Sequence, residues 1–331
     1  TDRAVAAANG LGFDLLRSLA DDTPGENVAI SPYSIFLALG LAHLGAAGET
    51  ADAMASTMHV SGLDSFTLGL ANAWTPNHVR CGGGEGADVR IANGLWLADG
   101  FEARVDYLAR AQSQYRAEVA ALDFASGDPA APINAWVRER TAGKIENAVA
   151  RIPPLTVLMI VNTVYFKGRW TAPFDSALTE DAPFHKVDGS DKAVAMMRFP
   201  MNERRLPYFE GDGVQSLRLA YGDDEALHMA LFLPEAGRTL ESVIAQLGTG
   251  AWDDWRGSYE FLKGQARLPR FTVEWKGSLV GPLAALGMGP AFEHSIADFS
   301  ALAVGDRAFA IDDVAHSVFV AVDEEGTEAG A

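Results

Sequence analysis

Eleven residues near the middle of the chain, TVLMIVNTVYF from Thr156 to Phe166, are apolar almost without interruption. They are rich in β-branched and aromatic side chains, which are typical of strands. A strand without polar alternation is covered on both faces, so its sheet needs protein layers above and below. The segment therefore predicts a central strand in a layered domain.

The other regular patterns follow a clear order along the chain. Apolar spacing predicts four helices, over 32–43, 46–58 and 107–119 and from about 133 onward. Further apolar runs predict strands over 89–98, 228–234, 308–313 and 317–322. Ser31 and Pro32 suit a helix start, because serine can cap the first turn and proline fits inside it. Helices first and then mainly strands predict an α+β fold rather than a regular βαβ alternation.

The charge balance narrows the range of partners. The chain has 26 Lys and Arg against 44 Asp and Glu, a formal net charge of -18. Such a surface repels the phosphates of nucleic acid and of anionic lipid, so neither nucleic acid nor membrane is expected as a partner.

The N-terminal segment lacks a continuous apolar core of signal-peptide length. The sequence therefore does not decide between a cytoplasmic and a secreted protein.

Motifs for catalysis, metals and cofactors are missing. No Gly-x-Ser-x-Gly elbow and no HExxH occur, the seven His are scattered, and Cys81 is the single cysteine. The formal dinucleotide pattern in 81–87 runs into a predicted strand instead of a helix, and Gly143-Lys144 lacks the rest of a P-loop. We expect no enzyme activity, no metal and no cofactor.

Several longer stretches match one family in that family's order. They are NVAISPYSI, LGAAGETADAM, INAWVRERTAGKIENAV, VNTVYFKGRWTAPFD, VAMMRF, LPRFTVEW, LAALGMGPAF and VAHSVFVAVDEEGTEAGA. Over essentially its whole length the chain resembles the serpin family of serine protease inhibitors, and we expect a prokaryotic member. The resemblance implies one domain over 1–331, with a large central, mostly antiparallel sheet, two smaller sheets and eight or nine helices.

The closing residues resemble the family's reactive-loop hinge, a segment that is loop in one state and strand in another. On this basis the predicted hinge consists of Glu324, Glu325, Gly326, Thr327, Glu328, Ala329, Gly330 and Ala331. Five of the eight are Gly, Ala or Thr, and none is proline, which suits a conditional strand.

Alternation along a strand assigns two faces to this hinge. Thr327, Ala329 and Ala331 are expected to point inward, with Glu328 and Gly330 toward solvent. Gly326 is expected to supply the backbone freedom for the reversal after the preceding strand.

The resemblance also implies a mechanism. A serine protease attacks the loop and forms an acyl-enzyme, and insertion of the hinge as a strand then traps the covalent complex. The protein would act as a monomer and suicide substrate, without catalytic residues of its own. The alternative is a non-inhibitory serpin with a binding, storage or chaperone role.

Two further groups of residues correspond to family positions. Ser31, Ser34, Asn162 and His316 match a polar cluster where the sheet opens, and we expect its hydrogen bonds to re-form as the strands part; a static buried network is the alternative. Trp170, Arg270 and Glu324 match the region of loop entry, with Arg270 and Glu324 as a candidate surface ion pair.

The sequence stops inside the expected loop, before the scissile bond and the C-terminal strands. One interpretation is a loop-cleaved molecule whose C-terminal peptide is a separate chain; the other is truncation. We favour cleavage, because loss of core strands would expose a large apolar surface. Cleavage predicts that 326–331 lie inserted as a strand.

Overall fold

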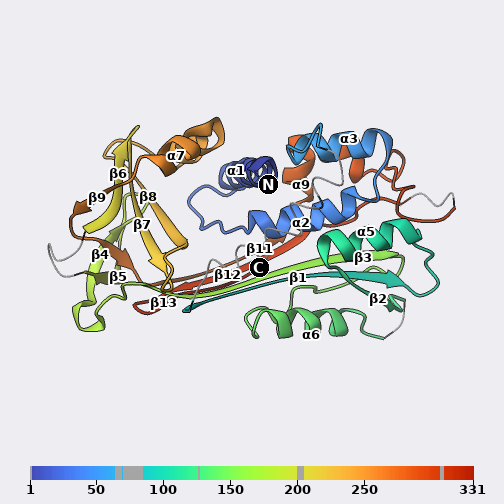
Figure 1. The fold of residues 1–331 in the computed structure, drawn as a ribbon, viewed down its shortest axis with the longest axis horizontal. Coiled ribbons are helices and arrows are strands. Elements are labelled where there is room, and N and C mark those ends of the chain that lie inside the picture. Colours follow the sequence, from blue (N-terminus) through green and yellow to red (C-terminus); the bar gives the residue numbers. More distant parts are fainter. Residues whose placement is uncertain (1, 64–68, 70–84, 126, 200–204, 306–308) are drawn as a thin grey trace.

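The central feature is a six-stranded sheet (Figure 1). The computed structural model describes residues 2–331 apart from 64–68, 70–84, 126, 200–204 and 306–308. In spatial order the strands are β11 (Phe271–Ser278), β12 (Ala315–Val322), β13 (Gly326–Gly330), β3 (Leu158–Arg169), β1 (Ala87–Ala98) and β2 (Glu118–Leu122). All neighbours are antiparallel except β1 and β2.

Helices cover both faces of this sheet (Figure 1). One face carries α1 (Asp2–Asp22), α2 (Pro32–His43), α3 (Gly48–Thr57), α5 (Val105–Tyr115) and α9 (Val280–Leu283). The opposite face carries α6 (Ala130–Arg140). The apolar segment that contains β3 is thus a central strand between two layers, as its composition predicts.

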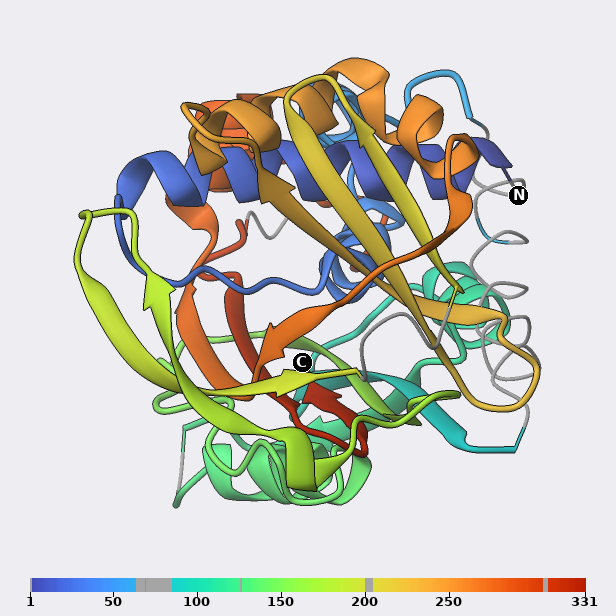
Figure 2. The same cartoon turned by 90° about the vertical axis from the view of Figure 1, so that its left-hand side faces the viewer.

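Two smaller sheets lie at one end of the molecule (Figure 2). The three-stranded sheet has the order β10 (Arg267–Pro269), β5 (Asp191–Arg198) and β4 (Glu180–His185). The four-stranded sheet has the order β8 (Leu227–Pro234), β7 (Val214–Tyr221), β6 (Arg205–Gly211) and β9 (Glu260–Lys263). Helices α7 (Leu240–Gln246) and α8 (Trp252–Gly257) and short helical turns at Ser176–Leu178, Leu247–Ala251, Ala284–Met288 and Gly289–Ala291 complete the described elements.

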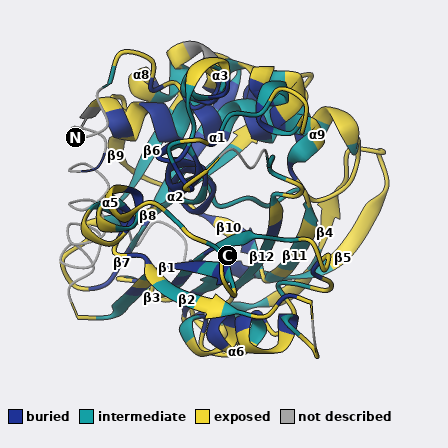
Figure 3. Cartoon of the chain, turned by 90° about the vertical axis from the view of Figure 1, so that its right-hand side faces the viewer, coloured by how far each residue is buried: buried dark blue, intermediate teal, exposed yellow. Residues whose placement is uncertain are grey.

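The largest core lies between the helices and the central sheet. Helix α2 is buried along most of its length, and Leu11 and Leu15 of α1 pack into the same cluster as Leu95 of β1. In Figure 3 the outer side of α6 is exposed, whereas buried residues concentrate around α1 and α2. The predicted α+β class, with a large, mostly antiparallel sheet, two smaller sheets and eight α-helices among the described residues, is confirmed.

Three sequence predictions about local structure were wrong. The helix predicted over 107–119 ends at Tyr115, because Arg116 takes a left-handed conformation (φ 51°) and strand β2 follows. Residues 309–313 form no strand; Phe309 instead stacks on Phe299. Ser31 occupies the N-cap position of α2, but its side chain makes no capping hydrogen bond. The 81–84 part of the glycine-rich stretch lies outside the described residues.

Candidate functional site

The predicted hinge forms a strand inside the central sheet. Strand β13 lies between β12 and β3 and runs antiparallel to both, with Thr327 opposite Val322 on one side and Gly168 on the other. Ala331 continues the ladder, because its N–H and C=O exchange hydrogen bonds of 2.7 Å with Val164. The 326–331 segment is therefore a central strand in this structure, the position that loop cleavage predicts.

An aspartate builds the turn that leads into this strand. The Asp323 Oδ1 atom accepts hydrogen bonds from the backbone N–H groups of Glu325 (2.9 Å) and Gly326 (3.0 Å). Aspartate commonly closes turns in this way. Asp323 is a residue of this turn that sequence reasoning missed, although its residue type after a strand was a usable signal.

Gly326 is needed for a different reason from the one predicted. Its φ lies outside the left-handed region, so the reversal does not depend on glycine's conformational freedom. A Cβ atom at this position would instead lie 2.1 Å from the carbonyl oxygen of Gly168. Close approach of two strand backbones therefore requires glycine at position 326.

The inward face of the hinge has the predicted composition. The Thr327 side chain is buried, and its Oγ1 atom accepts a 2.6 Å hydrogen bond from the hydroxyl of Tyr221. Burial raises the pKa of that tyrosine. Ala329 and Ala331 follow on the same face and are half-buried. Small side chains thus occupy the positions that face the interior.

The other face does not point to solvent, so the sequence expectation for Glu328 and Gly330 was wrong. Gly330 is buried, and the Glu328 side chain is only 23% exposed. The chain that follows α6 covers both residues: Lys144 forms an ion pair with Glu328, and Lys144 and Ile145 lie over Gly330. Alternation correctly placed Glu328 and Gly330 on the face opposite Thr327, but it could not predict that the chain after α6 packs against that face.

The residues expected at loop entry lie together at the base of β13. Arg270 pairs with Glu324 at 2.7 Å, and the Trp170 indole N–H donates to the Asp323 carbonyl at 2.9 Å. Glu324 is buried rather than exposed, and it also accepts a 2.7 Å hydrogen bond from Thr179. Burial alone would raise the pKa of Glu324, but these hydrogen bonds and the charge of Arg270 hold it below the ordinary value.

The four residues of the predicted polar cluster lie around the start of α2, in two separate branches. The Ser31 backbone N–H donates to Nε2 of His316 at 3.0 Å, whereas the Ser34 hydroxyl donates to Asn162. His316 is buried, and burial lowers its pKa to about 4. An acceptor role for Nε2 agrees with a neutral ring.

Asn93 extends the second branch, which sequence reasoning missed. Asn162 donates to Asn93 Oδ1 at 2.7 Å, and Asn93 donates to the carbonyl of Tyr115 at 2.7 Å. The branch therefore joins α2, β3, β1 and the end of α5 in one partly buried chain of hydrogen bonds.

The two branches also face one another across the sheet. Gly330 pairs with Tyr165 on β3 and with Phe319 on β12. Asn162 precedes Tyr165 by three residues, and His316 precedes Phe319 by three. Because β3 and β12 both run antiparallel to β13, Asn162 and His316 lie at the same level of the sheet, on either side of the path along which β13 would continue. The start of α2 contacts both flanking strands.

The described residues offer no metal site of the usual kind, because no group of three His, Cys, Asp or Glu side chains among them could hold an ion. In the same part of the chain, no helix combines the length and apolar character needed to cross a bilayer.

Comparison with known proteins identifies the family. The model of the family described as "Serpin (serine protease inhibitor)" matches residues 6–331. An uncharacterized serpin-like protein of Thermococcus kodakarensis is 35% identical, with 99% of this chain and 74% of that protein covered. Bovine leukocyte elastase inhibitor is 34% identical, with 100% and 88% covered.

A solved structure shows the same fold. The structure titled "Cleaved Serpin 42Da" has a TM-score of 0.91 at 26% identity and covers 99% of this chain and 88% of that one. The chain belongs to the serpin family. Members of this family are described as protease inhibitors, so the protein is not an enzyme.

Proposed function

We propose that the protein is an inhibitory serpin, a single domain over 1–331 that acts as a monomer and traps a serine protease as a covalent acyl complex. The loop beyond Ala331 is the bait. After attack, the freed hinge enters the central sheet between β3 and β12 and carries the bound protease with it.

The observation that carries this proposal is that β13, whose inward side chains are small, lies as a central strand between the two long strands β3 and β12. A strand of about a dozen residues forms ten or more backbone hydrogen bonds, each worth about 1 kcal/mol net, so insertion is favoured by about 10 kcal/mol. It also spans about 40 Å at roughly 3.3 Å per residue, which is enough to carry an attached enzyme along the sheet.

The residues around the strand have roles in this proposal. Glu324, Arg270 and Trp170 hold the base of the hinge where insertion begins. Asn162 and His316 flank the row that the strand reaches as it advances, and Ser31 and Ser34 at the start of α2 give these two side chains partners in the opened sheet.

The proposal adds a second partner, the C-terminal peptide that cleavage releases. Among the described residues β8 pairs only with β7, so its other edge is free to accept a strand. Beside it lies a cavity of about 540 Å³ whose lining includes five leucines, among them Leu217, Leu231 and the 64% exposed Leu233. An apolar peptide that adds a strand to β8 would cover this surface.

A non-inhibitory serpin is the second candidate. Such a protein has no need to keep the inward positions of its hinge small, and bulky or charged residues there would block insertion. Thr327, Ala329 and Ala331 are all small, which favours the inhibitory function.

The test uses protein with its complete reactive loop and a panel of serine proteases that includes elastases, the target named for the bovine relative. We expect a complex that survives boiling in detergent. Thr327→Arg should be cleaved without forming the complex, because insertion would bury a charge beside Tyr221 at a cost of several kcal/mol.

The matched control is Glu325→Arg, which adds the same side chain at an exposed position two residues away and should still form the complex. Cleavage of the wild-type loop by these proteases without any covalent complex would contradict the inhibitory function.

A further inference from the structure

The chain that follows α6 forms a cover over the outer face of the inserted hinge. A Cβ atom at Gly330 would lie 3.6 Å from Lys144 Cβ and 3.7 Å from Ile145 Cγ1. These are ordinary contact distances, so alanine fits at position 330 and a larger side chain would have to displace the cover. The outer face of β13 is thus closely packed against the chain that follows α6.

We propose that Lys144 is a positioning residue that, together with Tyr165, recognises the carboxylate of Glu328 only after the hinge has entered the sheet. The inference rests on the proposed insertion of the loop and adds a selection rule to it. The sheet favours a hinge that has an acidic residue at position 328 and a residue no larger than alanine at position 330.

The geometry gives each carboxylate oxygen its own donor. The Lys144 ammonium lies 2.8 Å from Glu328 Oε2, and the Tyr165 hydroxyl donates to Oε1 at 2.9 Å. Charged hydrogen bonds of this length are stronger than neutral ones. An amide at position 328 would keep an acceptor for one donor but would present N–H groups to the other.

Partial burial strengthens this contact. The side chain of Lys144 is 33% exposed, and its ammonium lies 5.5 Å from the ring centre of Phe319 on β12. Tyr165 on the opposite strand is buried. Burial alone would raise the pKa of Glu328. The hydrogen bonds from Lys144 and Tyr165 lower it by more than burial raises it, so the pKa lies below the ordinary value. The carboxylate is therefore bound in its charged form.

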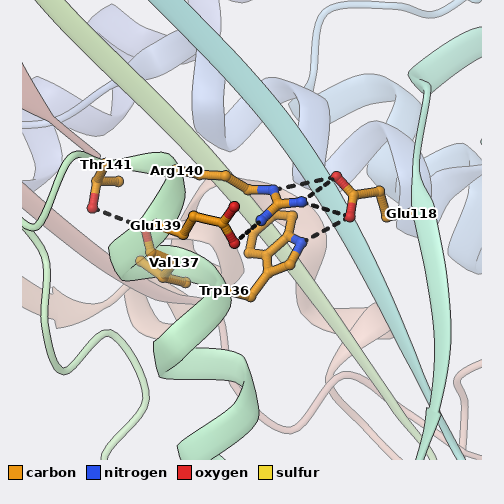
Figure 4. Close-up of polar contacts among 6 residues, drawn as sticks. All are labelled: Glu118, Trp136, Val137, Glu139, Arg140 and Thr141. Carbon is orange, nitrogen blue, oxygen red and sulfur yellow. Dashed lines mark hydrogen bonds and ion pairs between the residues drawn. The ribbon is translucent and has the colours of Figure 1, made fainter.

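The cover is held in place by contacts that do not involve the hinge (Figure 4). Arg140 pairs with Glu118 of β2 at 2.7 Å, and the Trp136 indole N–H donates to the same carboxylate at 3.1 Å. Arg140 also stacks over the Trp136 ring at 4.4 Å. These contacts fix the last turn of α6 on the edge of the central sheet.

The turn that carries Lys144 continues from this anchored end. The Thr141 hydroxyl donates to the Val137 carbonyl at 2.9 Å and accepts from the Ile145 N–H at 3.2 Å. Lys144 itself donates its backbone N–H to the Thr141 carbonyl at 3.0 Å. Because no residue of β13 takes part, the position of Lys144 is set before the strand arrives.

The test is a mutant cycle on protein with its complete loop, before and after cleavage. Lys144→Glu and Glu328→Lys should each lower the melting temperature of the cleaved form by about 1 to 3 °C, and the charge-swapped double variant should recover most of that loss. Both single variants should also yield a smaller fraction of trapped protease. The intact form should show no change with Glu328→Lys, because the pair exists only after insertion.

Two controls separate this pair from general charge effects. Lys192 is exposed on β5, and Glu325 is exposed on the turn before β13. Lys192→Glu and Glu325→Lys should leave the melting temperature of the cleaved form nearly unchanged. Additive losses in the double variant, or an equal loss in the intact form, would overturn the inference.

The readouts also separate this inference from the proposed function. A cleaved form that is stabilised by the pair but traps no protease would leave the inference standing and remove the inhibitory function. A protein whose melting temperature does not rise on cleavage would overturn both.

Discussion

His316 is a buried residue of the central sheet whose ionisation state affects stability. Its ring accepts a hydrogen bond from the Ser31 N–H, which requires an unprotonated nitrogen, and burial lowers its pKa from 6.5 to about 4. A group with a lowered pKa in the folded state contributes stability that is complete above the unfolded pKa and is lost as the pH falls toward the folded one.

This pKa predicts how acid affects the protein. Between pH 7 and pH 5 the wild type should lose about 2 kcal/mol of unfolding free energy through His316 alone. His316→Gln keeps an acceptor for Ser31 but cannot titrate, so it should lack this part of the loss. Urea unfolding at the two pH values measures the difference. An identical pH dependence in both proteins would show that the ring is already protonated or solvated in the folded state.

The residue scale also shows where sequence reasoning reached its limit. Alternation along the strand was enough to predict that Ala329 and Ala331 share the face of Thr327. It could not predict why Gly326 is required, because the clash involves the carbonyl of Gly168, a residue distant in sequence. The contact of Lys144 with Glu328 could not be predicted for the same reason, since the two residues are distant in sequence.

At the scale of elements, patterns with strong end signals were predicted well. Helix α2 spans Pro32–His43 as its proline and apolar run predict, and the apolar segment from Thr156 lies largely in β3. The end of α5 was missed because Arg116 adopts a left-handed conformation, for which arginine gives no signal. Position in a sheet depends on partners, which a single sequence does not reveal.

The free edge of β8 gives a prediction at this scale. After cleavage of the complete loop, the C-terminal peptide should stay bound along β8 and over the adjacent leucine-lined cavity. Native mass spectrometry should therefore give the summed mass of both fragments, whereas denaturing conditions should separate them. Leu233→Asp should weaken this retention by placing a carboxylate in the apolar contact. Loss of the peptide from the wild type under native conditions would contradict this docking position.

At the scale of the whole molecule, the proposed function requires a central sheet that exists with and without β13. Strands β3 and β12 are tied to their outer neighbours β1 and β11 by long ladders, and the start of α2 contacts both. On the proposed function, we expect each half of the sheet to keep its own support when the hinge is absent. This arrangement agrees with the proposal that one segment is a loop in one state and a central strand in another.

Hydrogen–deuterium exchange of the hinge tests this two-state account most directly. In protein with its complete, uncleaved loop, the backbone amides of 327–331 should exchange rapidly, because they lack strand partners. After cleavage, the same amides should become as protected as those of β3, since both edges of β13 are then paired. Equal protection before and after cleavage, or none in either form, would contradict the account.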